Sequence, residues 1–241
     1  PKYSNPTGIS CSDEVVTRLA SMKTAASDFR IFWDNAYTVH HLYNASNRNE
    51  VKDVLGACKE ARNADRVFIF GSMSKITFAG AAVAAMGGSE ENMTWKKKAL
   101  AFSTIGPDKI NQVRHTRFFP NMDAVMNHMD KHADILRAKF EVVLEVLNTK
   151  LAGKELATWT TPKGGYFISL DTNEGCAKRV VQLAADAGVK LTAAGATFPY
   201  GKDPKDSNIR LAPSLPSVSE IRTAMEIVAL CIELADAEKK A

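Results

Sequence analysis

Residues 66–75 read RVFIFGSMSK, in which a run of aromatic and β-branched residues ends abruptly at a polar turn. The run predicts a buried strand over residues 66–70, and Gly71 marks its end. A second run of this kind, FRIFW at residues 29–33, ends at Asp34, and a helix is predicted between the two over residues 49–62. Strand, helix and strand at this spacing predict a βαβ unit and therefore a parallel sheet.

The second half of the chain has a different pattern. Apolar residues recur at helical spacing through residues 121–151, which predicts one helix of about 45 Å that can link two domains. The other predicted elements are a helix capped by Ser12, strands at 79–86, 166–170, 189–191 and 208–211, and helices at 177–187 and 219–235, the last capped by Ser219. We therefore expect an α/β fold, with a mostly parallel sheet flanked by helices in residues 1–118 and a smaller C-terminal α+β domain in residues 119–241.

Composition argues against several classes of function. The chain is 45% hydrophobic and 24% charged, which is typical of a globular protein. Its net charge of +4 is mild and its basic residues are spread out, so we expect no nucleic-acid partner. No apolar run approaches the ~20 residues of a membrane-spanning helix, so we expect no membrane partner. The four cysteines are widely spaced and predict a reduced, cytoplasmic protein without a metal site.

Reactive side chains follow both strands of the predicted βαβ unit, where ligands of parallel sheets bind. The first strand is followed by Asp34 and Tyr37, and the second by Ser72, Ser74 and Lys75. Each residue alone is compatible with an ordinary role, such as a helix cap, a turn residue or a surface lysine. Together they provide an amine, a carboxylate, a phenol and two hydroxyls at one rim, which is the set that a phosphorylated pyridine cofactor needs.

The chemistry of such a cofactor suggests a role for each group. Asp34 can keep the ring nitrogen protonated, which makes the ring a better electron sink. Tyr37 and Asn5 can donate to the phenolate oxygen of the ring. Ser72 and Ser74, with the backbone amides of their turn, can bind the phosphate.

The order of four motifs resembles that of the fold type I, class I/II aminotransferases, which depend on pyridoxal 5'-phosphate (PLP). The motifs are NPTG at residues 5–8, Asp34-x-x-Tyr37, Ser72-x-Ser74-Lys75 and Arg210, and PKGGYF at residues 162–167 is also similar to a family motif. Three further segments, KITFAGA at 75–81, NQVRH at 111–115 and AGATFP at 194–199, look like those of bacterial type Ic aspartate aminotransferases. The resemblance covers essentially the whole chain.

The resemblance implies a mechanism and a domain plan. Lys75 would hold PLP as a Schiff base and shuttle the proton between Cα of the substrate and C4′ of the cofactor. Arg210 would grip the α-carboxylate of the amino acid through two parallel bonds. Aspartate and 2-oxoglutarate would be the substrates and the whole protein a homodimer. Residues 1–118 would be the C-terminal part of the large PLP-binding domain, and residues 119–241 the small domain.

The chain departs from the family pattern in two respects. Many members carry an arginine about eight residues after the lysine, whereas residues 81–83 here read AAV. The type Ic subgroup also lacks this arginine, and we expect Arg114 or a part of the protein outside this chain to supply the charge. The chain begins at Pro1 in a loop-like segment, so we interpret it as the C-terminal portion of such an enzyme, one that can lack activity by itself.

Other functions remain open on the sequence alone. The same scaffold supports decarboxylases, lyases and transaminases for aromatic amino acids, and also the sensing domains of some transcription regulators. Arg210 favours transamination of α-amino acids because it fixes a carboxylate. Lys75, Asp34 and Tyr37 together argue against a non-catalytic domain. The pair His40-His41 could suggest a metal, but no second ligand cluster accompanies it, and we expect a structural role.

Overall fold

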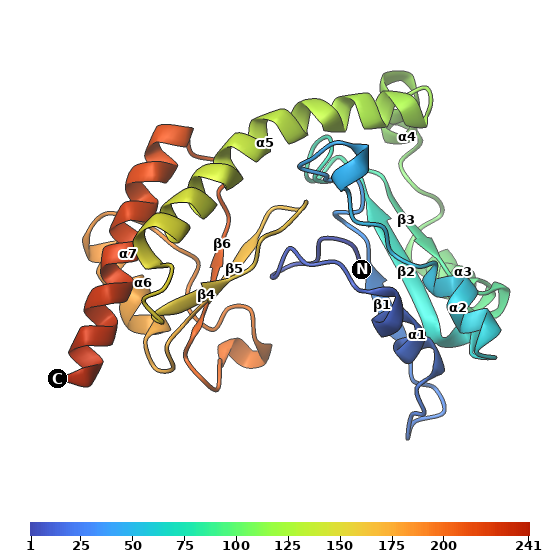
Figure 1. Ribbon diagram of the computed structural model, residues 1–241. Coiled ribbons are helices and arrows are strands. Elements are labelled where there is room, and N and C mark those ends of the chain that lie inside the picture. Colours follow the sequence, from blue (N-terminus) through green and yellow to red (C-terminus); the bar gives the residue numbers. More distant parts are fainter. The chain divides into compact units, whose positions relative to one another are not determined.

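All residues, 1–241, are described by the computed structural model, in which the chain forms two units (Figure 1). Unit 1 contains Pro1–Ser4, Ser10–Val39 and Asn49–Met129. Unit 2 contains Asn5–Ile9, His40–Arg48 and Asp130–Ala241. The chain passes from unit 1 to unit 2 for the last time inside helix α5 (Met122–Leu151), which matches the long helix predicted from residues 121–151.

Unit 1 is built on a three-stranded sheet of order β1-β2-β3. Strands β1 (Ile31–Asp34) and β2 (Val67–Ser72) pair in parallel, as the βαβ pattern predicted. Strand β3 (Ala84–Gly87) pairs antiparallel to β2, with Ser72 opposite Ala84. The expected mostly parallel sheet is therefore mixed, and the buried strand predicted at 79–86 starts later and is only partly buried. A turn closed by the bond from Ala81 N to Phe78 O, with Gly80 at a φ of 78°, reverses the chain there.

Two helices of unit 1 cover one face of this sheet. Helix α1 (Asp13–Ser21) begins as predicted at Ser12, whose hydroxyl accepts from Val15 N at 3.3 Å. Helix α2 (Val54–Glu60) is shorter than predicted because the Asp53 side chain caps it. Both helices pack on Trp33 and Val67 through buried residues: Val16, Ala20, Val54, Ala57 and Cys58. The unit also contains α3 (Glu90–Ser103), α4 (Lys109–Phe118) and the 3-10 turn Ala64–Arg66.

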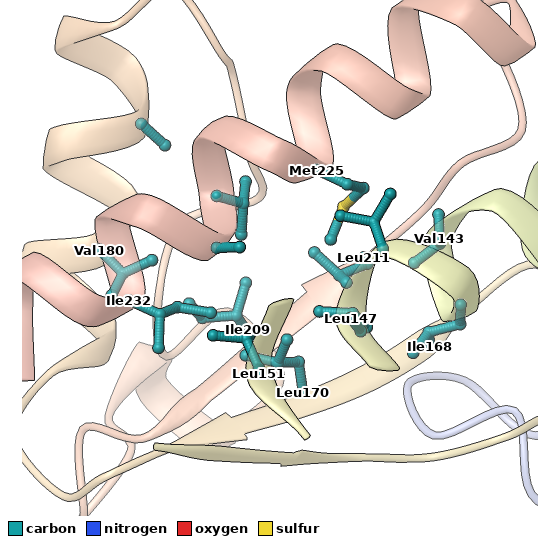
Figure 2. Close-up of a cluster of buried hydrophobic side chains, with 14 of the residues drawn as sticks. Val143, Leu147, Leu151, Ile168, Leu170, Val180, Ile209, Leu211, Met225 and Ile232 are labelled. Atoms are coloured by element: carbon teal, nitrogen blue, oxygen red, sulfur yellow. The ribbon is translucent and has the colours of Figure 1, made fainter. Parts of the chain in front are cut away.

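Unit 2 contains an antiparallel sheet of order β4-β5-β6 (Ala157–Trp159, Ile168–Thr172, Asn208–Leu211). Its helices are α5, α6 (Ala177–Asp186) and α7 (Val218–Lys240), with 3-10 turns at Ala45–Asn47 and Pro199–Gly201. Figure 2 shows apolar side chains of these helices and of the sheet meeting in one cluster, including Leu147 of α5, Leu170 of β5 and Ile232 of α7. Strand β6 matches its prediction, and its alternation sends Ile209 and Leu211 into this core.

Two predictions for unit 2 are wrong. No strand forms at residues 189–191, because Gly188 adopts a φ of 88° and Val189 N bonds back to Ala184 O at the end of α6. Helix α7 is capped by Ser217 rather than Ser219, and Ser217 forms a reciprocal capping box with Glu220. No helix is both long enough and apolar enough to span a membrane.

Candidate active site

Parallel pairing brings the ends of β1 and β2 to one rim of the unit 1 sheet. Asp34 lies opposite Phe70, and Ser72 follows two residues later on β2. Side chains alternate across a strand, so Asp34, Phe70 and Ser72 share one face of the sheet. The structure therefore brings the predicted carboxylate and the predicted serine turn to the same edge and the same face.

The end of β1 is held by local hydrogen bonds. Asn35 N donates to Phe70 O at 2.8 Å, and Ala36 N donates to Asp34 Oδ1 at 3.0 Å. Asp34 itself is exposed. A carboxylate has acceptor capacity on both oxygens, so the bond to Ala36 leaves room for a cationic partner. Tyr37 lies just beyond this turn with its side chain buried.

The predicted serines and lysine form a tight turn beyond β2. Ser72 Oγ accepts from Ser74 N at 3.1 Å and donates to Ser74 Oγ at 2.8 Å. Because the Ser74 hydroxyl accepts that bond, its own hydrogen is available for another acceptor. Met73 O accepts from the backbone amides of Ile76 and Thr77, which closes the turn around Lys75. Lys75 is exposed on this turn.

Arg210 occupies the middle of β6 in unit 2, on the face opposite the core. Its Nη1 donates to Asn5 Oδ1 at 2.9 Å, and its guanidinium carbon lies 4.6 Å from the centre of the Phe167 ring. Its Nε is buried without a hydrogen-bond partner. An unpaired buried donor costs about 1–3 kcal/mol. Phe167, the residue beneath this guanidinium, was not among the predicted site residues.

Asn5 is positioned by the segment around it. Thr160 Oγ1 donates to the Thr7 carbonyl at 2.9 Å, which ties the NPTG segment to unit 2. Gly8 has a φ of 68°, and a Cβ there would lie 2.5 Å from the Phe167 carbonyl oxygen. Only glycine fits so close an approach. The NPTG segment thus belongs to the unit that carries Arg210.

The loop before β6 is organised by Asp203. Its Oδ2 accepts from Ser207 N and Asn208 N, each at 2.8 Å, and its Oδ1 accepts from Lys205 N at 2.9 Å. Burial raises the pKa of the Asp203 carboxyl, but backbone hydrogen bonds outweigh burial, so the pKa lies below its ordinary value. Asp203 therefore holds the start of β6 through its charged form.

The seven predicted site residues divide between the units. Unit 1 holds Asp34, Tyr37, Ser72, Ser74 and Lys75, and unit 2 holds Asn5 and Arg210. The pairing of Asn5 with Tyr37 at one ring oxygen stays a prediction. Arg114, the candidate phosphate ligand, donates through Nη2 to Asn111 Oδ1 at 2.6 Å and to Ala81 O at 3.4 Å. His40 is buried edge-on against Tyr166, with 5.2 Å between ring centres.

Comparison with known proteins places this fold among the aminotransferases: an aspartate transaminase structure from Corynebacterium glutamicum superimposes with a TM-score of 0.96 at 48% identity. That match covers 100% of this chain and 56% of the other. The family model described as aspartate amino-transferase matches residues 1–241. The chain therefore belongs to the aspartate aminotransferase family, a family of PLP enzymes of fold type I, as its motifs predicted.

Two curated relatives match over almost the whole chain. A Mycolicibacterium smegmatis protein named as an aminotransferase is 50% identical over 238 residues, which are 99% of this chain and 55% of that protein. The aspartate aminotransferase of Corynebacterium glutamicum is 48% identical over 238 residues, with the same coverage of 99% and 55%. The chain thus spans about half the length of these relatives.

Proposed function

We propose that the protein carrying this chain transfers the amino group of an α-amino acid to a 2-oxo acid with PLP, and that aspartate and 2-oxoglutarate are its substrates. The observation that carries the proposal is the amine of Lys75, presented on a serine-rich turn at the same sheet rim as the Asp34 carboxylate. Family membership supports the reaction class, and the names of the relatives support the choice of substrates.

The donor set of unit 1 fits PLP chemically. The two serines and the backbone amides of their turn suit a phosphate, and Asp34 suits a protonated ring nitrogen. Arg114 is engaged with Asn111 and the Ala81 carbonyl, so hydroxyls and backbone amides provide the phosphate donors within this unit. When bound, PLP supplies an electron-withdrawing ring that stabilises negative charge at the substrate Cα.

Lys75 has two tasks in the proposed reaction. Its Nζ would hold the cofactor covalently. As a free amine it would act as the general base that takes the proton from Cα of the amino acid. The exposed position of Lys75 on the turn suits both tasks, because the amine has to reach an atom of a bound molecule.

Arg210 binds the α-carboxylate of the substrate in this proposal. A guanidinium stays charged and forms paired bonds to a carboxylate. The bond to Asn5 and the Phe167 ring fix the guanidinium plane. Arg210 thereby selects α-amino acids over simple amines, and it favours transamination over loss of the carboxylate.

A substrate panel tests the proposal on the complete polypeptide that contains this chain. Aspartate, glutamate, phenylalanine and tyrosine are each offered with 2-oxoglutarate or oxaloacetate, and the new amino acid is quantified. We expect aspartate to exceed the aromatic substrates in kcat/KM by about tenfold or more, roughly the discrimination that one buried charge pair provides. Preference for an aromatic amino acid would refute the substrate assignment, and transfer from none of them would refute the reaction.

We also propose that the complete polypeptide forms a homodimer. Light scattering of the same sample tests this proposal.

A further inference from the structure

Two histidines from neighbouring helices bond to the turn that carries Lys75. His115 of α4 places Nε2 2.9 Å from Thr77 Oγ1. His128 of α5 places Nε2 3.1 Å from the carbonyl oxygen of Ile76. Ile76 and Thr77 directly follow Lys75, and all five residues belong to unit 1.

Hydrogen-bond partners fix where the ring hydrogens lie. His115 Nδ1 is 2.8 Å from the Asn111 carbonyl, which only accepts, so Nδ1 carries a hydrogen. The Thr77 hydroxyl also donates to the Met73 carbonyl at 3.1 Å, so His115 and Met73 bond to the same hydroxyl. His128 Nε2 faces the Ile76 carbonyl and must therefore donate. Each histidine thus forms a hydrogen bond to one of the two residues that follow Lys75.

Packing restricts the motion of the side chains around these two hydrogen bonds. The side chains of His115 and Ile76 are buried. The ring of His128 packs edge-on against Phe118 and Phe119, with ring centres 5.7 and 5.3 Å away. A hydrogen bond held by packed aromatic rings loses little side-chain entropy when it forms.

Helix α4 also holds the return leg of the same loop. Asn111 Nδ2 donates to Ala82 O at 3.3 Å, and Arg114 Nη2 donates to Ala81 O at 3.4 Å. Three residues on consecutive turns of α4 thus bond to both legs of the loop between β2 and β3. The loop that presents Lys75 is fixed from outside as well as by its own turn.

We propose that His115 and His128 are positioning residues that set the place of the Lys75 amine by clamping the backbone at Ile76 and Thr77. This inference rests on the proposed function of Lys75. A lysine side chain is long and flexible, so its amine is placed accurately only if its backbone is fixed. A displacement of about 1 Å at a reacting group can cost about 100-fold in rate.

Two substitutions remove hydrogen bonds at Ile76 and Thr77 and keep the packing. Thr77→Val removes the hydroxyl that bonds to His115 and to the Met73 carbonyl but keeps the shape of the side chain. His128→Phe keeps a ring against Phe118 and Phe119 but removes the donor to Ile76. Thr116→Val is the matched control, because its hydroxyl donates to the Val113 carbonyl within α4 and it is exposed.

The first readout is hydrogen–deuterium exchange of the segment 73–83, measured on the complete polypeptide before PLP is added. We expect Thr77→Val and His128→Phe to exchange about tenfold faster there, because the free energy of opening the turn falls. The control Thr116→Val should match wild type. The second readout is steady-state kinetics with PLP bound. We expect kcat to fall about tenfold or more while the KM for the amino acid stays within about twofold, and His128→Gln, which keeps an N–H donor, to recover most of kcat.

Two results would overturn the clamp. One is wild-type exchange together with wild-type kcat in both variants. The other is a loss of kcat that is always accompanied by a lower melting temperature and is not rescued by His128→Gln. That result would indicate a structural role alone. A Lys75→Ala variant separates the two proposals. If Lys75→Ala still turns over substrate, the role proposed for Lys75 is wrong. If Lys75→Ala is inactive while Thr77→Val and His128→Phe are fully active, only the proposed role of the two histidines is wrong.

Discussion

Arg210 Nη1 donates a hydrogen bond of 2.9 Å to Oδ1 of Asn5, although 205 positions separate the two residues in the chain. The bond forms because the NPTG segment is tied to unit 2 through Thr7 and Gly8. A neutral amide oxygen orients the guanidinium without neutralising its charge. That charge therefore remains available for a carboxylate.

We expect Arg210→Lys to weaken binding of the amino acid substrate by about 2–5 kcal/mol, because an ammonium cannot form the paired bonds of a guanidinium. The measurement is the apparent dissociation constant for aspartate in the complete polypeptide. Arg222→Lys is the matched control, since Arg222 makes a paired contact to Glu145 in the same unit, at 2.9 and 2.8 Å. Unchanged affinity in Arg210→Lys would remove Arg210 from the carboxylate site.

Asp203 should make the stability of the start of β6 depend on pH. Its folded pKa lies below the ordinary carboxyl value of about 3.9, so the carboxylate contributes stability above that pH. The contribution is lost as the pH falls through the folded pKa. We expect hydrogen exchange of residues 207–211, corrected for the intrinsic effect of pH, to accelerate in the wild type below about pH 4.

Asp203→Asn should remove most of this pH dependence and accelerate exchange in residues 207–211 already at neutral pH. Asp186→Asn is the control, because it replaces an exposed carboxylate on α6 that accepts one bond from the Gln182 side chain at 2.8 Å. A pH profile of Asp203→Asn that matches the wild type would show that Asp203 does not hold this loop through its charge.

Ser217 should contribute more to α7 than Ser219. Ser217 Oγ accepts from Glu220 N at 3.3 Å, and Glu220 Oε2 accepts from Ser217 N at 2.7 Å. Loss of an N-cap hydroxyl costs about 0.5–2 kcal/mol, whereas surface changes usually stay within about 0.5 kcal/mol. We expect Ser217→Ala to lower the protection of the first turns of α7 by that larger amount and Ser219→Ala to lower it little. Equal effects would argue against the capping box.

Local patterns predicted the elements that their own residues determine. Strand β6 is a short run with apolar residues at every second position, Ile209 and Leu211, and α5 carries an apolar stripe along its length, so both were predicted with accurate bounds. The parallel pair β1 and β2 followed from two apolar runs joined by a helix. The rim that carries Asp34 and Lys75 could be inferred from the same pattern, because ligand groups follow parallel strands.

Long-range contacts decided what the sequence could not predict. The direction of β3 depends on the turn around Gly80, and the apolar run at 79–86 gives no signal of direction. The run at 189–191 looks like a strand, but the bond from Val189 N to Ala184 O ends α6 there instead. The contact of Arg210 with Asn5 and Phe167, and the contact of Thr77 with His115, join segments that are distant along the chain.

We propose that Lys75 is the residue that holds PLP. The most direct test is to add PLP to the complete polypeptide, record visible absorbance, reduce with borohydride and map the labelled peptide. We expect an absorbance band of bound cofactor and a stable label on Lys75, with no label in Lys75→Ala. A label on another lysine, or equal labelling of Lys75→Ala, would contradict it.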